Sequence, residues 1–273
     1  MRSFLFVPGS KPERFAKALA AGADAVIVDL EDAVADVDKT SARARVAEAA
    51  CVFSASPVRV LLRINAAGTQ WFDDDLSLAG LDGIDGIVLP KAEKSAALAA
   101  VAAATVKPVL PIIESAEGVW KALEVARMPG VERLIFGSVD FELDVDCDGS
   151  WDALLHARSR IVLASRIAAI QSPVDGVTVA IDDERQLAED SSKGRSLGFG
   201  GKLCIHPRQV AAVNAAFSPS AVELAKAQRI VDAYERAEGG AVSVDGRMVD
   251  LPVLLKARRI VNWSQDVRGR VEG

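Results

Sequence analysis

The feature that most constrains the fold is a regular alternation of short apolar segments with alanine-rich segments of helical periodicity. Eight apolar segments have the length of a β-strand, and most are continuously apolar rather than alternating. Continuous apolar strands are typical of parallel sheets that are covered on both faces. The predicted strands are residues 4–7, 25–30, 58–64, 86–89, 109–113, 133–136, 176–181 and 202–205.

Helical periodicity fills most of the intervals between these strands, at residues 13–21, 41–50, 95–104, 118–126, 151–169 and 184–197. Strand and helix in alternation predict βαβ units, and eight such units favour a closed TIM (β/α)8 barrel. A doubly wound open sheet is the alternative that periodicity does not exclude.

The pattern changes after the eighth predicted strand. A long helix is predicted over residues 221–237, a short hairpin over 241–249, and a basic helix over 251–263. This tail is too long for a last barrel helix. We therefore expect a barrel of residues 1–216 and a C-terminal helical arm or lid of residues 217–273, which could pack on a neighbouring subunit.

Charge and composition exclude several classes of protein. A formal net charge of −6 and a pI near 5.1 leave no basic surface for nucleic acid. No apolar run approaches the roughly 18 residues of a membrane span, and the N-terminal run is too short for a signal peptide. Cys51, Cys147 and Cys204 are widely spaced, as free thiols in a reducing compartment would be. We expect a cytoplasmic protein.

Two carboxylates follow consecutive predicted strands. Glu114 follows residues 109–113, and Asp140 follows residues 133–136 by a few positions. Neighbouring strands lie about 4.8 Å apart, so both side chains could reach one cation. With no His or Cys beside them, oxygen ligation favours Mg²⁺ or Mn²⁺. The alternative is that these acids cap the following helices, as Glu114 and Ser115 could do for a helix at Gly118.

Arg63 lies near the end of the third predicted strand, before Ile64 and Asn65, where its guanidinium would lie just inside the barrel mouth. A planar fork of donors there suits a substrate carboxylate or a keto-acid oxygen. An ion pair with Glu31 or Asp32 is an alternative that is compatible with substrate binding. Active sites of barrel enzymes lie at this carboxyl-terminal rim.

The polar residues at the remaining strand ends are weaker evidence for a functional site. Lys91 follows the fourth strand, and a lysine at a rim is usually solvated. We expect Asp182 at the end of the seventh strand. His206 could be a ligand or a base, or could simply begin a helix before Pro207. No Ser-His-Asp or Cys-His arrangement is convincing.

Several motifs, taken in order, resemble one family. They are RSFLFVPG at residues 2–9, DLEDAV at 29–34, RIN at 63–65, LPK at 89–91, IE at 113–114, GSVD at 137–140 and GKLCIHP at 201–207. Together they cover essentially the whole chain and resemble the citrate lyase β-subunit/malyl-CoA lyase group of the HpcH/HpaI aldolase family.

The resemblance implies a TIM barrel, Mg²⁺ held by Glu114 and Asp140, and Arg63 bound to a 2-oxoacid or an acyl carbonyl, with Glu31 and Asp32 behind it. It also implies coenzyme A across the barrel mouth, where the expected binding residues are Pro8, Arg14, Lys17, Ile205 and His206. Homotrimers or hexamers are implied, and so are citrate lyase α and acyl-carrier partners.

The tail extends the resemblance. Residues 246–252 (GRMVDLP) are similar to the C-terminal segment of malyl- and citramalyl-CoA lyases, which implies that Asp250 acts as an acid/base in a neighbouring subunit's site. The alternative is that Asp250 is the N-cap of the helix that follows. One departure is the acidic run of residues 141–148, where the family often has a Leu-Gly pair.

The predicted function is Mg²⁺-dependent cleavage or formation of a carbon–carbon bond in a malyl-, citramalyl- or citryl-type thioester. The products of cleavage are an acetyl- or acyl-CoA and a 2-oxoacid. A metal and Arg63 would stabilise the oxoacid charge, and Asp250 would move the proton. The alternatives are a coenzyme A-independent class II aldolase that gives pyruvate, and a non-catalytic acyl-CoA-binding subunit of a citrate lyase complex.

Overall fold

The computed structural model describes residues 1–237 and 242–271. The chain divides into two compact units, Met1–Phe217 (unit 1) and Ser218–Gly273 (unit 2), and each is described by itself. Residue 241, where the predicted hairpin begins, lies outside the described residues.

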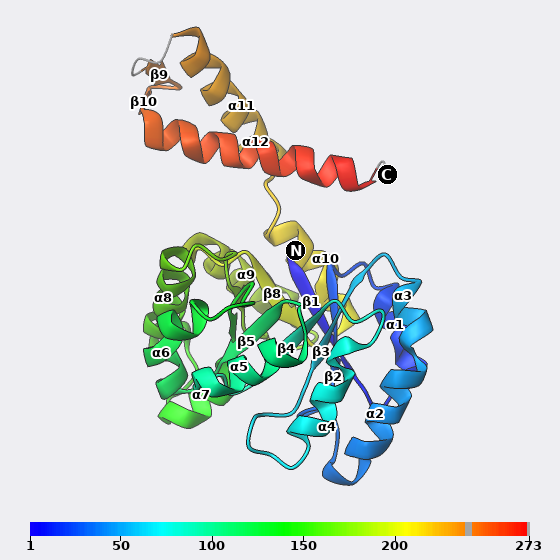
Figure 1. Cartoon of the computed structure of the whole chain (residues 1–273). Helices are drawn as coiled ribbons and strands as arrows, with labels where there is room; N and C mark the ends of the chain where they lie inside the picture. The colour runs from blue at the N-terminus through cyan, green and yellow to red at the C-terminus, as the bar shows by residue number, and fades with distance from the viewer. Residues whose placement is uncertain (238–241, 272–273) are drawn as a thin grey trace. The chain divides into compact units, whose positions relative to one another are not determined.

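Unit 1 is a closed barrel of eight parallel strands in sequential order, with β1 hydrogen-bonded to both β2 and β8. This confirms the predicted TIM barrel and excludes the open sheet (Figure 1). The strands are β1 (Ser3–Pro8), β2 (Ala25–Asp29), β3 (Arg59–Arg63), β4 (Gly86–Leu89), β5 (Val109–Ile113), β6 (Ile135–Phe136), β7 (Val174–Asp175) and β8 (Gly201–Cys204).

Helices surround the barrel (Figure 1). They are η1 (Pro12–Arg14), α1 (Phe15–Leu19), η2 (Asp36–Asp38), α2 (Lys39–Glu48), α3 (Ala50–Ser54), α4 (Phe72–Leu76), η3 (Ser77–Gly80), α5 (Ser95–Ala104), α6 (Ala116–Ala126), α7 (Ser138–Val145), α8 (Trp151–Ile167), α9 (Glu184–Leu197) and α10 (Pro207–Ala216).

The seventh strand begins two residues earlier than predicted and ends before the predicted strand begins. Val174 pairs with Ile135 on one side and with Gly201 on the other, which fixes β7 at Val174–Asp175. The apolar residues 176–181, predicted as strand, run beyond the barrel, and Val179 is 65% exposed. The prediction was wrong because register in a closed barrel is set by both neighbours, which apolarity along the chain does not report.

Alternate residues of each strand face two different apolar layers. One set fills the barrel interior and includes Phe4, Ile27, Leu61, Val88 and Ile112. The other set packs between the strands and the helices, as Leu5 and Val26 do. Because both faces are buried, the strands are almost continuously apolar, and most polar residues lie at the strand ends, with Lys202 inside β8 as an exception.

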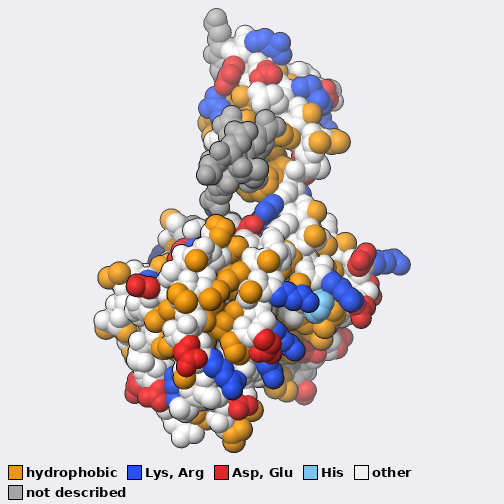
Figure 2. Space-filling model, turned by 90° about the vertical axis from the view of Figure 1, so that its right-hand side faces the viewer, with side chains coloured by type: hydrophobic (Ala, Val, Ile, Leu, Met, Phe, Trp, Pro, Cys, Tyr) orange, Lys and Arg blue, Asp and Glu red, His pale blue; other side chains and the backbone are white. Residues whose placement is uncertain are grey.

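The outer surface of unit 1 also carries apolar side chains. Figure 2 faces the side on which α1 and α3 lie, where apolar residues gather. Leu19 of α1 and the exposed Val52 of α3 line a shallow groove there of about 560 Å³.

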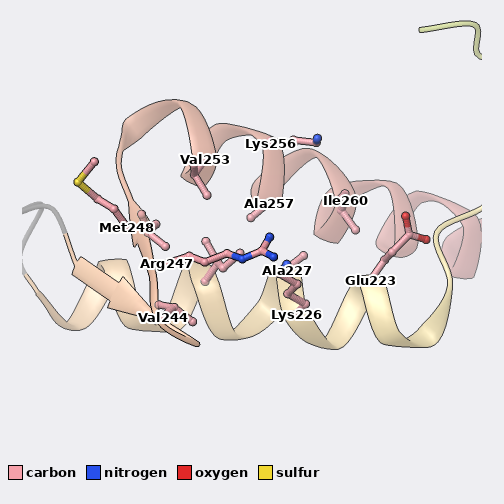
Figure 3. Close-up of a pocket in the computed structure, with 12 residues that line it drawn as sticks. Glu223, Lys226, Ala227, Val244, Arg247, Met248, Val253, Lys256, Ala257 and Ile260 are labelled. Carbon is pink, nitrogen blue, oxygen red and sulfur yellow. The ribbon is translucent and has the colours of Figure 1, made fainter. Parts of the chain in front are cut away.

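Unit 2 contains α11 (Ala221–Arg236), an antiparallel hairpin of β9 (Val242–Val244) and β10 (Arg247–Val249), and α12 (Leu251–Val271). A small core of residues such as Ile230 and Leu254 joins the two helices to the hairpin. Figure 3 shows the Arg247 side chain between α11 and α12, within a cavity of about 380 Å³. Among the described residues, no helix is long and apolar enough to cross a membrane.

Candidate active site

Arg63 is held at the end of β3 by carboxylates from the neighbouring strand and loop. Its Nε and Nη2 donate to the two oxygens of Asp29 at 2.7 and 2.6 Å, because Asp29 ends β2 in register with Arg63. Its Nη1 lies 3.0 Å from Glu31 Oε2 and 3.2 Å from Asp32 Oδ2. Burial lowers the pKa of Arg63, but Asp29 and the two further acids outweigh it and the net shift is upward. The predicted pairs with Glu31 and Asp32 are present, and Asp29 is the main partner.

Glu31 connects Arg63 to Lys91. Its carboxylate is buried, and Oε1 accepts a hydrogen bond of 3.2 Å from Lys91 Nζ. The 3.0 Å approach of Oε2 to Arg63 is a charge contact without hydrogen-bond geometry, so Oε2 has no hydrogen-bond partner among the described residues. Burial raises the pKa of Glu31 to about 7, although the Arg63 charge opposes this shift. The rim therefore holds a carboxyl group that titrates near neutral pH.

Glu114 follows β5, and its Oε1 accepts a hydrogen bond of 2.6 Å from the backbone N–H of Lys91. Lys91 has a positive φ of 48°, a strained conformation for a residue other than glycine. Space for Glu114 depends on Gly137, because a Cβ there would lie 2.6 Å from Glu114 Oε2. Burial and then the Glu31 charge raise the pKa of Glu114 to about 8.

Asp140 lies in the first turn of α7, a few positions after β6 ends at Phe136. The chain leaves β6 at Phe136, turns at Gly137 and enters the helix at Ser138. The negative charge of Asp140 contributes to the raised pKa of Glu114, which shows that the two carboxyl groups are close enough to interact.

Neither acid is a helix cap. Ser115, not Glu114, caps α6 by accepting from the N–H of Gly118 at 3.0 Å. In the part of the chain that the structure describes, the Asp140 carboxylate has no hydrogen-bond or ion-pair partner.

This pair of acids fits a hard divalent cation. Two carboxylates without nitrogen or sulfur donors are the ligand set of Mg²⁺ rather than Zn²⁺. The raised pKa of the buried Glu114 carboxyl group indicates that too little positive charge lies near it, and a bound cation would supply that charge. Within residues 1–237 and 242–271, no group of three or more His, Cys, Asp or Glu side chains is placed to hold a metal. Glu114 and Asp140 could therefore contribute two ligands, with water or substrate completing the coordination.

A cavity of about 710 Å³ opens beside Arg63. Its lining includes every residue that the sequence associates with coenzyme A, namely Pro8, Arg14, Lys17, Ile205 and His206. Arg14 ends η1, Lys17 lies on α1, and neither has an ion-pair partner among the described residues. The arrangement offers two uncompensated cations to an anionic ligand that extends from Arg63.

His206 begins a helix, which is one of the alternatives that the sequence left open. It is the N-cap of α10, and its Nδ1 accepts from the N–H of Arg208 at 3.2 Å. Asp182 is exposed in the loop after β7 and pairs with Arg208 at 2.7 Å, so it is not the acid of the seventh strand. That acid is Asp175, which is buried and accepts from Arg158 Nε at 2.9 Å.

Sequence reasoning missed Asp175 and its buried neighbour Lys202, which donates to the carbonyl oxygen of Gly176 at 2.7 Å. Acid and lysine face the helices rather than the barrel mouth, so they stabilise the loop after β7. The signal in the sequence that could have identified them is that Asp175 and Lys202 are charged residues directly beside short apolar runs.

Asp250 belongs to unit 2. Its Oδ1 accepts from the N–H of Val253 at 3.2 Å, so it caps the start of α12, which is one of the two roles that the sequence predicts. The side chain is exposed. Its proposed role in a neighbouring subunit's site remains a prediction.

The fold and the site define a class: a (β/α)8 barrel whose rim combines a buried arginine with two carboxylates suited to a divalent cation. The chain belongs to the HpcH/HpaI aldolase/citrate lyase family, whose sequence profile matches residues 2–207.

Relatives in this family match over nearly their full length. A citrate lyase subunit beta-like protein of Deinococcus radiodurans is 37% identical, with 96% of each chain covered. A (3S)-malyl-CoA thioesterase of Cereibacter sphaeroides is 35% identical, covering 97% of this chain and 95% of that protein. Among solved structures, CitE of Mycobacterium tuberculosis in complex with magnesium, acetoacetate and coenzyme A is 35% identical. Its TM-score is 0.84, with 97% of this chain and 98% of that chain covered.

Proposed function

We propose that this protein is a Mg²⁺-dependent carbon–carbon lyase that cleaves or forms a 3-hydroxyacyl thioester such as malyl-, citramalyl- or citryl-CoA. The products of cleavage are an acetyl- or acyl-CoA and a 2-oxoacid. The observation that carries the proposal is the placement, on one barrel rim, of Arg63, the Glu114–Asp140 pair and the cavity with Arg14 and Lys17. Related structures bind magnesium with oxaloacetate, or magnesium with acetoacetate and coenzyme A.

Each end of the substrate would have its own residues. Arg63 would bind the acid end through the second N–H of Nη1 or Nη2, because Nε donates to Asp29 and each Nη already donates one hydrogen bond, to Asp32 and Asp29 respectively. Arg14 and Lys17 would bind the phosphates of coenzyme A by charge, and the apolar lining would contact the pantetheine chain. Glu114 and Asp140 would hold Mg²⁺, which when bound supplies positive charge to the oxygens of the oxoacid.

Cleavage requires a base that removes the proton of the 3-hydroxyl group. The C2–C3 bond then breaks, its electron pair forms the thioester enolate, and the hydroxyl carbon becomes the keto carbon of the oxoacid. Returning the proton to the enolate carbon gives the acyl-CoA. Asp250 from a neighbouring copy is the proposed acid/base, in a cytoplasmic homotrimer or hexamer. Citrate lyase α and acyl-carrier partners are a further expectation.

A second candidate is thioester hydrolysis, favoured by relatives that are named (3S)-malyl-CoA thioesterases. Malyl-CoA distinguishes the two reactions: a lyase gives acetyl-CoA and glyoxylate, whereas a thioesterase gives free coenzyme A and malate. The purified protein should be incubated with Mg²⁺ and malyl-, citramalyl- or citryl-CoA, and the products identified by mass spectrometry. Absence of carbon–carbon cleavage with all three thioesters would contradict the proposal.

A class II aldolase and a non-catalytic subunit can be told apart from the lyase by binding and turnover. A class II aldolase would cleave a hydroxy-oxo acid to pyruvate and would not bind coenzyme A in calorimetry. A non-catalytic subunit would bind the thioester without turnover, and Asp250→Asn would change nothing.

A further inference from the structure

The buried ammonium group of Lys39 lies beneath the loop that carries Glu31. Lys39 is the first residue of α2 and is 5% exposed. Its Nζ donates to the carbonyl oxygens of Leu30 and Glu31 at 2.9 and 2.7 Å and to Asn65 Oδ1 at 2.8 Å. An ammonium group has three N–H donors, so none remains for a ligand. Lys39 therefore acts on the loop and not on a substrate.

Asn65 extends the support to a second buried charge pair. Its Nδ2 donates to the Leu30 carbonyl oxygen at 2.9 Å and to Asp75 Oδ2 at 2.6 Å. Asp75 is fully buried on α4, and its other oxygen pairs with Arg43 of α2 at 3.1 Å. The carbonyl groups of the loop are thus anchored to α2 and α4.

The opposite edge of the loop is held by Asp29. Its two carboxylate oxygens accept from the N–H groups of Glu31 at 2.8 Å and Ala33 at 3.1 Å, and they also accept from Arg63. The carbonyl groups of the loop are bound by Lys39 and Asn65, and its N–H groups by Asp29. Residues 30–33 therefore have little freedom to move.

A fixed loop has a consequence for both halves of the site. Glu31 contacts Arg63 Nη1 at 3.0 Å and Lys91 Nζ at 3.2 Å. The backbone N–H of Lys91 in turn binds Glu114. Glu31 thereby links the arginine proposed to bind the oxoacid to the loop that orients a proposed metal ligand.

We propose that Lys39 is a positioning residue that holds residues 30–33, and through Glu31 sets the placement of Arg63 relative to Lys91 and Glu114. Its effect on the 2-oxoacid rests on the proposed function, whereas its effect on the loop does not. The substitution that tests it is Lys39→Met, which keeps the length of the side chain and removes its donors. The matched control is Lys107→Met, since Lys107 Nζ donates to the Leu81 carbonyl oxygen at 2.7 Å on the amino-terminal side of β5.

Two measurements need no turnover. Hydrogen exchange should show the amides of Glu31 and Ala33 exchanging at least about tenfold faster in Lys39→Met and unchanged in Lys107→Met. Calorimetry in the presence of Mg²⁺ should show that Lys39→Met binds oxaloacetate about 10- to 100-fold more weakly than the wild type, whereas Lys107→Met binds it as the wild type does. This range is usual when a residue that orients a ligand-binding residue is lost. Should Lys39→Met not fold, Asn65→Ala removes one acceptor of Lys39 and one donor to Leu30 and should accelerate the same amides.

The outcomes separate the two proposals. Unchanged exchange at Glu31 and Ala33 would overturn the role of Lys39, and so would faster exchange with unchanged oxaloacetate binding. Wild-type protein without lyase turnover would contradict the proposed function alone, because neither measurement on Lys39 depends on turnover.

Discussion

Arg63→Met should destabilise unit 1 strongly. The arginine is the main counter-charge of Asp29, which is 1% exposed, and it also faces the buried Glu31. Removing one partner of a buried ion pair costs about 3–5 kcal/mol, because the remaining charge is left without compensation. For a unit of this size, each kcal/mol lowers Tm by about 2–4 °C, so Tm should fall by roughly 6–20 °C.

The assay is thermal and urea unfolding followed by circular dichroism. Arg208→Met is the matched control, because Arg208 and Asp182 are paired at 2.7 Å but are 73% and 81% exposed. An exposed pair contributes about 0–1 kcal/mol, so the control should unfold almost as the wild type does. Adding Asp29→Asn to Arg63→Met should recover part of the loss, because it removes the orphaned charge.

The dependence on pH has a definite sign. Arg63 lowers the pKa of Glu31, which burial has raised to about 7, so removing Arg63 raises that pKa further. A carboxyl group with a raised folded pKa contributes stability below its unfolded pKa and loses it as pH rises through the folded value. The part of the Arg63→Met deficit that comes from Glu31 should therefore be small near pH 5 and grow as pH rises above about 7, in addition to the loss that comes from Asp29. A Tm within about 2 °C of the wild type at pH 7.5 would refute the reasoning about the buried charges.

Three further predictions concern the proposed metal ligand Glu114, Asp250 and the cysteines. Glu114→Gln should weaken Mg²⁺ binding in calorimetry by at least about tenfold. In the wild type, the Mg²⁺ affinity should fall by up to about tenfold for each pH unit below 8, because Mg²⁺ competes with the proton on Glu114. Equal affinity at pH 6 and 8 would exclude Glu114 as a ligand. Asp250→Asn should reduce lyase turnover by about 10²–10⁴-fold and leave Mg²⁺ affinity unchanged; full turnover would exclude its role as acid/base. In native protein, maleimide should modify the exposed Cys51 quickly and leave Cys204 intact, because burial raises the pKa of the Cys204 thiol to about 12; peptide mapping that finds Cys204 modified first would contradict this.

The barrel could be predicted because both faces of its strands are buried. The bounds of β4 and β5 match the prediction, since each is an apolar run that ends where the chain reaches the rim. The short helix that carries Asp140 was not predicted from the sequence. The end of β6 at Phe136 matches the prediction, but apolarity did not show that a helix begins two residues later, at Ser138.

The sequence predicted which side chains reach the rim, but not how they pair with one another. The sequence placed Arg63 near Glu31 and Asp32 because strand ends converge. It did not identify Asp29 as the bidentate partner, which depends on the register of β2 against β3. Lys39 was missed because a lysine at the start of a helix usually faces solvent. Its burial follows from how α2 packs under residues 30–33.

The charge balance of the rim indicates the order in which cation and acid bind. Five carboxyl groups and two cationic side chains meet there: Asp29, Glu31, Asp32, Glu114 and Asp140 against Arg63 and Lys91. An anionic 2-oxoacid would be repelled by this excess of negative charge unless a divalent cation offsets it.

We therefore expect Mg²⁺ to bind first and the oxoacid to depend on it. Calorimetry with oxaloacetate should detect binding in the presence of Mg²⁺ and none after treatment with EDTA. Binding of Mg²⁺ should be measurable without oxaloacetate. Equal oxaloacetate affinity with and without Mg²⁺ would mean that Arg63 alone overcomes the acidic rim, and that the Glu114–Asp140 pair takes no part in holding the acid.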